Sequence, residues 1–250
     1  MKVPILLPNI FNHPFTYESD QSLEIGDYVL VPFGKSKITG VVWDDFEKKN
    51  NKNFKIKKII RKLEVPRIKK NTIKFLNWFS EYNIIPKGMS LKLMLLSGNA
   101  IEKFSNIDFQ KFEFIEKNNS FKLSEEQKNS LIKMNELNDK FRVHVLQGTT
   151  GSGKTMVYFE ALKDRILKGF QGLILLPEIG LTGQFESKFI EFFGFQPAIW
   201  HSGVSKKNKE IIWSGIANGK IKVVIGARSS LFLPFKNLGL IVVDEEHDQS

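Results

Sequence analysis

The sequence predicts an α/β protein in which a parallel sheet covered by helices follows a smaller β-rich domain. In the second half, short apolar runs alternate with segments of helical periodicity, the pattern of a parallel sheet with crossover helices. In the first half, β-branched and aromatic runs flank turn residues, as in antiparallel hairpins. The chain has 250 residues, enough for two modest domains that each bury a core.

The first domain is expected over residues 1–104. Residues 25–43 predict a hairpin with its turn at 32–37, and 54–63 predict a further strand after a polar loop. Residues 72–82 carry apolar side chains at helical spacing. Residues 105–122 are polar and mixed, and we interpret them as a connector.

The second domain is expected over residues 123–250. Ser124 followed by Gln127 has the spacing of a capping box and predicts the start of a helix. Further helices are predicted at 154–167, 181–193 and 205–217, and strands at 143–146, 172–176, 197–200, 222–225 and 238–243.

Composition indicates a soluble globular protein, with 42% apolar and 26% charged residues. The absence of cysteine excludes disulfides and thiolate metal sites within these residues. Pro4 and Pro8 interrupt the N-terminal apolar run, which has no cleavage site, and no run is long enough to span a membrane. We therefore expect a cytoplasmic protein without membrane contact.

The net charge of +10 predicts a polyanionic partner, most often nucleic acid. Residues 48–62 contain eight basic residues and no acid, a patch suited to phosphates. Two alternatives stay open: lysine is also abundant in proteins from AT-rich genomes, and the patch could be a lysine-rich loop leading into a solvated strand face.

A glycine-rich segment, GTTGSGKT, matches the phosphate-binding pattern GxxxxGK[ST] between a predicted strand and a predicted helix. The glycines let backbone N–H groups turn toward phosphate oxygens, the lysine reaches the β and γ phosphates, and the threonine hydroxyl binds Mg²⁺. The predicted ATP-binding residues are Gly148, Thr149, Thr150, Gly151, Ser152, Gly153, Lys154 and Thr155. The alternative is a strand-to-helix turn that binds nothing.

An acidic cluster, DEEH, ends the last predicted strand at the carboxyl edge of the sheet. Asp244 is expected to hold Mg²⁺ through water, and Glu245 to orient and deprotonate the attacking water. A base next to the metal carboxylate favours an ATP-hydrolysing motor. Gln127 is a candidate for the adenine edge or, alternatively, only a capping residue, and the acidic cluster alone could be a solvated loop.

Together these motifs resemble those of superfamily 2 helicases of the DEAH type. LLPEIGLT at 175–182, WHSG at 200–203 and residues 225–248 are similar to the replication restart helicases of this superfamily. The resemblance implies a RecA-like lobe of an ATP-dependent 3′ to 5′ DNA helicase that recognises stalled forks and initiates primosome assembly. The implied partners are forked and single-stranded DNA, primosome proteins and single-strand-binding protein.

The N-terminal half resembles the domain with which that family captures the 3′ end of a nascent strand. By this resemblance VPFGK at 31–35 and a later lysine supply pocket residues: Gly34, Lys35 and Lys57. The family usually has an acidic residue at the position of Thr16. The resemblance also places Thr182, Arg228 and Ser229 against single-stranded DNA, with helix capping or simple surface exposure as the alternatives.

The tryptophans could stack on bases, with core packing as the alternative.

The resemblance also indicates what these 250 residues do not contain. A second motor lobe with an arginine finger and zinc-binding cysteines is expected elsewhere, and the connector is too short for the winged-helix domain that the family often inserts. The chain is therefore expected to be an N-terminal portion of the helicase, inactive by itself without the second lobe. The alternatives are a non-hydrolysing module that binds forked DNA and ATP, or a different superfamily 2 DNA translocase.

Overall fold

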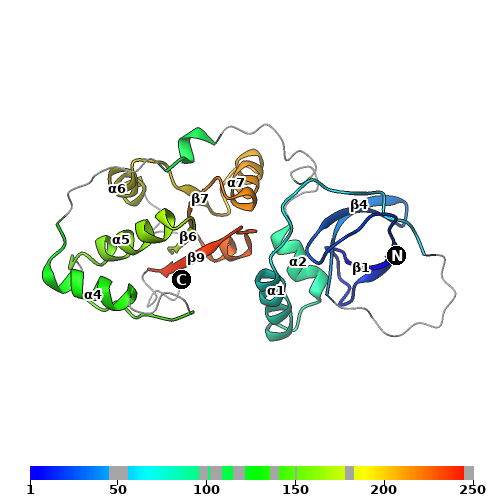
Figure 1. Ribbon diagram of the computed structural model, residues 1–250, viewed down its shortest axis with the longest axis horizontal. Helices are drawn as coiled ribbons and strands as arrows, with labels where there is room; N and C mark the ends of the chain where they lie inside the picture. The colour runs from blue at the N-terminus through cyan, green and yellow to red at the C-terminus, as the bar shows by residue number, and fades with distance from the viewer. Residues whose placement is uncertain are drawn as a thin grey trace. The chain divides into compact units, whose positions relative to one another are not determined.

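The computed structural model describes residues 1–44, 56–95, 101, 109–114, 122–135, 141–149, 151–177 and 183–244. The chain divides into two compact units (Figure 1). The first contains residues 1–108, 203–219 and 232–236, and the second contains residues 109–202, 220–231 and 237–250. Among the described residues, no helix has the length and apolar character needed to cross a membrane.

The first unit is built on a five-stranded antiparallel sheet of order β2-β1-β4-β3-β5. Its strands are β1 (Lys2–Leu6), β2 (Phe15–Glu18), β3 (Tyr28–Phe33), β4 (Ser36–Val42) and β5 (Arg61–Lys62). Strands β3 and β4 form the predicted hairpin, closed by a two-residue turn at 34 and 35 in which Gly34 has φ 59°. This positive φ suits glycine, because it has no Cβ to clash.

The strand predicted at 54–63 is shorter in the structure, where Arg61–Lys62 form β5. The reason is that the backbone of this segment forms hydrogen bonds first to β2 and then to β3. Lys57 and Ile59 bond to Glu18 of β2 through their backbone, whereas Ile60 and Leu63 bond to β3. The segment thereby connects the two edges of the sheet, with an isolated bridge between Glu18 and Lys58. Buried apolar side chains of the first unit form a small core, which contains Val3, Ile5, Leu7, Tyr17, Leu23, Val29, Val31 and Val42.

Two helices, α1 (Lys70–Tyr82) and α2 (Lys87–Met94), accompany this sheet (Figure 1). Trp43 after β4 donates its indole N–H to Asn77 of α1 at 3.2 Å. At Gly88 of α2 an added Cβ would lie 2.4 Å from the carbonyl oxygen of Asn9, so only glycine permits this close approach.

Helix α7 (Lys206–Asn218) groups with the first unit, although in sequence it lies between two strands of the second unit's sheet. Its Trp213 is fully buried, donates Nε1–H to the carbonyl of Met94 at 2.9 Å, and meets the ring of Tyr28 edge-on at 5.9 Å. The aromatic side chain supplies apolar area, and its polar N–H is satisfied on burial.

The second unit has a four-stranded parallel sheet of order β7-β8-β6-β9. The strands are β6 (Gln171–Leu175), β7 (Ala198–Trp200), β8 (Val223–Gly226) and β9 (Leu238–Val243). Its helices are α4 (Glu125–Asn135), α5 (Lys154–Leu167) and α6 (Gly183–Phe193), with 3₁₀ segments η1 (Gln110–Phe112) and η3 (Arg228–Phe232). The α/β class and the parallel sheet are confirmed.

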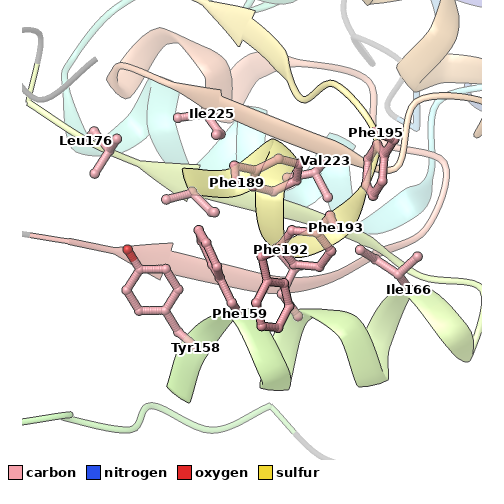
Figure 2. Close-up of a cluster of buried hydrophobic side chains, with 12 residues drawn as sticks. Tyr158, Phe159, Ile166, Leu176, Phe189, Phe192, Phe193, Phe195, Val223 and Ile225 are labelled. Atoms are coloured by element: carbon pink, nitrogen blue, oxygen red, sulfur yellow. The ribbon is translucent and has the colours of Figure 1, made fainter. Parts of the chain in front are cut away.

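Helices α5 and α6 pack on this sheet through an aromatic cluster. Figure 2 shows Phe159 of α5 beside Phe189, Phe192 and Phe193 of α6, with side chains of β8 near them. Most of these rings meet at steep angles, as in the contact of Phe159 with Phe189 at 83°. Edge-to-face contacts of this kind add to the stabilisation from buried area.

The predicted strand at 143–146 is wrong. These residues form no strand, and Val143 and Val145 expose most of their side chains. An apolar run forms a strand only when neighbouring strands pair with it and cover its side chains, and among the described residues β9 pairs with β6 alone.

Candidate nucleotide and nucleic-acid sites

The glycine-rich segment leads directly into the amino end of α5. Gly151 and Gly153 both have φ 81°, and Gly153 is the N-cap residue of the helix. Ser152 donates its backbone N–H to Thr149 at 3.2 Å and closes the turn. A helix amino end leaves backbone N–H groups without intrahelical partners, and these attract anions.

Lys154 lies in the first turn of α5 and folds back over the loop. Its ammonium donates to the carbonyls of Gly148 at 2.7 Å and Thr149 at 3.0 Å. Thr155, the next residue, is half-buried. The loop thus brings together its glycines, a cation and a hydroxyl, while Thr150 lies outside the described residues.

Gln127 contacts the same loop from α4. Its side-chain oxygen accepts from the N–H of Ser124 at 2.9 Å, and the Ser124 hydroxyl accepts from the N–H of Gln127, which completes the predicted capping box. Its Nε2 donates to the carbonyl of Ser152 at 3.0 Å. A Cβ on Gly153 would lie 2.3 Å from this Nε2, whereas at Gly151 the space is open. The capping role is therefore observed, and the adenine contact stays a prediction.

Asp244 follows β9 at the carboxyl edge of the sheet. Its backbone N–H bonds to Leu175 of β6 at 3.0 Å, and its carboxylate accepts a 2.7 Å hydrogen bond from the buried Tyr158 hydroxyl. Tyr158 lies one helical turn after Lys154, so this bond fixes the carboxylate beside the start of α5. Sequence reasoning missed Tyr158. Its position four residues after the P-loop lysine was the available signal.

These residues fit a magnesium nucleotide in their chemistry. The helix amino end and Lys154 match phosphate oxygens, and the Thr155 hydroxyl and Asp244 carboxylate are hard oxygen ligands of the kind that Mg²⁺ takes. Glu245, the predicted base, lies outside the described residues. Within the described ranges, no cluster of three or more acidic or histidine side chains could hold a metal by itself.

In the first unit, the structure brings two predicted pocket residues together. The Lys57 ammonium donates to the carbonyl of Gly34 at 3.5 Å, a long hydrogen bond from the end of an exposed side chain. Its backbone carbonyl accepts from Glu18 of β2 at 3.0 Å, so the residue is held at both ends. Lys35 shares the exposed turn.

The segment 15–17 of β2 separates its side chains between two faces, as alternation in a strand requires. Tyr17 is buried, donates to the carbonyl of Pro32 at 3.1 Å, and has its pKa raised by burial. Thr16 is exposed. Phe15 packs edge-on against Phe33, which precedes the turn, at 5.4 Å.

Acidic partners neutralise part of the predicted basic patch. Lys58 pairs with Asp20 at 3.1 Å, and Lys62 pairs with Asp27 at 2.7 Å. Among the described residues of this segment, Lys57 contacts the hairpin turn. Residues 45–55 lie outside the described part of the chain.

The predicted contacts of the second unit lie at the same sheet edge as Asp244. Arg228 and Ser229 are exposed in η3, which follows the carboxyl end of β8. Thr182 falls outside the described residues.

A glycine-rich loop that leads into a helix packed on a parallel sheet, with a carboxylate at the end of one of the strands, is typical of the nucleotide-binding lobes of motor proteins. Residues 125–250 match the family described as DEAD/DEAH box helicase, and the chain belongs to this family. Residues 2–96 match the family described as 3'DNA-binding domain.

The relatives carry the name replication restart protein PriA. The protein of Rickettsia conorii is 45% identical over 98% of this chain and 37% of its own length. The protein of Helicobacter pylori is 32% identical over 95% of this chain and 36% of its own, and that of Bacillus subtilis 35% over 64% and 20%. The resemblance to replication restart helicases is thereby confirmed, and the chain spans little more than a third of the length of the relatives that cover most of it.

Proposed function

We propose that this chain is the fork-binding and ATP-binding portion of an ATP-dependent 3′ to 5′ DNA helicase that restarts stalled replication. Lys154, Thr155 and Asp244 would hold Mg²⁺–ATP with the loop 148–153, and Glu245 would deprotonate water. The helicase would act in the cytoplasm, at the replication fork. Its partners would be primosome proteins and single-strand-binding protein. Zinc belongs to a lobe outside these 250 residues.

One observation supports the DNA-binding part of the proposal. The Lys57 ammonium donates a hydrogen bond to the carbonyl of Gly34, within a unit that matches a 3'DNA-binding domain. A cation at an exposed turn with an open backbone suits a terminal nucleotide, because the cation attracts the phosphate and glycine admits the sugar closely. For the 250 residues alone we propose binding without turnover, since an arginine finger supplies about 10³ to 10⁵ in rate in related P-loop enzymes.

The test is binding of a fluorescent forked DNA, with the 3′-hydroxyl at its junction free or blocked, across a salt series. Blocking should weaken binding by the wild type, and Lys57→Ala should abolish the difference. Lys58→Ala is the matched control, because it removes the neighbouring cation, which pairs with Asp20 instead of Gly34. Equal affinity for forks, duplexes and single strands, with the same dependence on salt, would refute fork recognition. The chain would then be a helicase lobe with general affinity for polyanions, and a DNA translocase of another kind would be the better proposal.

A further inference from the structure

Trp78 differs from the other tryptophans of the chain. Trp43, Trp200 and Trp213 are buried, whereas Trp78 on α1 exposes 54% of its surface. Tyr82, one turn later, exposes 73%. The helix buries its opposite face through Ile73, Leu76 and Ser80, so both aromatic rings extend from the outer side of the first unit's helix.

The exposed rings form a ladder with Phe75. The ring centroids of Phe75 and Trp78 lie 6.1 Å apart, with 29° between the ring planes. Those of Trp78 and Tyr82 lie 5.2 Å apart, with 24° between the planes. Positions 75, 78 and 82 share one helix face, which explains the near-parallel order. The Phe75 ring also contacts the ring of Phe232, which is the last residue of η3 and groups with the first unit, at 5.5 Å between centroids. Near-parallel rings also occur in the buried cluster, where Phe189 and Phe193 meet at 28°, so the exposure of Trp78 and Tyr82 is what distinguishes the ladder from core packing.

The end of α1 holds a third exposed apolar side chain in a rigid turn. Ile84 donates its N–H to Glu81 and Ile85 to Ser80, the paired bonds of a Schellman motif. Ile84 occupies the position usually taken by glycine, with φ 54°, and exposes 93% of its surface. A β-branched residue is rare in this backbone region.

Charge around the ladder favours an anion. Lys69, Lys70 and Lys74 are exposed at and near the amino end of α1, and Lys74 lies one turn before Trp78 on the same face. Glu81 is the acid of the helix, and it lies at the opposite end from the lysines.

We propose that the ladder of Phe75, Trp78 and Tyr82 is a stacking surface for the bases of single-stranded nucleic acid, with Lys74 beside the phosphates. Near-parallel rings with exposed surface suit unstacked bases, and single strands offer base faces that a duplex buries. This site lies on an element other than the Gly34 turn, and it rests on the DNA-binding half of the proposed function.

The test follows tryptophan fluorescence of the 250-residue chain during titration with an oligothymidylate. Because the other tryptophans are buried, stacking should quench Trp78 in particular. Trp78→Ala should weaken binding about tenfold, the size expected when one base loses its aromatic partner. Trp78→Phe should keep most of the affinity and lose the quenching signal, as followed by anisotropy of a labelled oligonucleotide.

One control variant and one variant of the site itself separate stacking from other effects. Leu93→Ala removes a comparably exposed apolar side chain from α2 and should leave affinity unchanged. Lys74→Ala should reduce the slope of log affinity against log salt by about one phosphate contact, whereas Trp78→Ala should keep the slope.

Binding of Trp78→Ala with wild-type affinity would overturn the proposal. A second result would also overturn it: the chain forms a dimer without nucleic acid, Trp78→Ala abolishes the dimer, and the affinity for the oligonucleotide does not change. The ladder would then be a surface for contact with protein. A wild type that binds neither forks nor single strands refutes the proposed function itself. Lys57-dependent fork binding that is indifferent to Trp78 refutes only the ladder.

Discussion

Replacement of Tyr158 by phenylalanine tests whether the Asp244 carboxylate is held in place for magnesium. The variant removes one hydroxyl from a buried ring and keeps the ring's contacts in the cluster of Figure 2. The lost bond is 2.7 Å long and ends on a carboxylate, so it belongs to the stronger, charge-assisted class.

The expected magnitude follows from that bond. Hydrogen bonds to charged groups contribute about 1.5–3 kcal/mol, and we take the low end because Asp244 is only half-buried. About 1.4 kcal/mol corresponds to a tenfold loss, at the lower end of the effects seen when residues behind metal ligands are replaced.

The assay is binding of a fluorescent ATP analogue at increasing free Mg²⁺. Without magnesium, Tyr158→Phe should bind the nucleotide as the wild type does, and about tenfold more magnesium should be needed to raise the affinity. Tyr17→Phe, which removes a buried hydroxyl from the other unit, is the matched control and should behave as wild type. Equal magnesium dependence in wild type and Tyr158→Phe would refute the positioning role, and no nucleotide binding by the wild type would refute the proposed site.

Two further predictions concern the first unit. The Tyr28 hydroxyl is buried without a partner among the described residues, so Tyr28→Phe should raise the free energy of unfolding by about 1 kcal/mol in urea. Burial also raises the pKa of Tyr28 far above its ordinary 10.0. The contribution of Tyr28 to the free energy of unfolding should therefore be fully present below pH 10. Above pH 10 the free energy of unfolding should fall by about 1.4 kcal/mol per pH unit, because there only the unfolded state loses the tyrosine proton. Tyr28→Phe should reduce this slope, and an unchanged slope would contradict the assignment. Ile84→Gly should stabilise the unit by about 0.5–1 kcal/mol in urea, since it removes left-handed strain at some cost in chain entropy, and Ile84→Ala should gain less; equal gains would show that backbone strain is not the cause.

Local signals predicted the parts of the site that depend on neighbouring residues. The helix expected at 154–167 is observed as Lys154–Leu167, because its apolar residues recur at helical spacing, a signal that the segment itself carries. The Ser124–Gln127 capping box formed for the same reason. The strand expected at 143–146 did not, since pairing depends on partners that its own sequence does not encode.

The sequence alone determined the family, the glycine-rich loop and the acidic strand end, since each is a short pattern of residue types whose chemistry holds wherever the segment lies. The tertiary structure decided which of these groups meet. The bond from Tyr158 to Asp244 spans 86 residues, and that from Lys57 to Gly34 spans 23. It also decided that Trp78 is exposed while the other tryptophans are buried. Such contacts result from how sheets and helices pack, and the composition of the local segment carries little information about them.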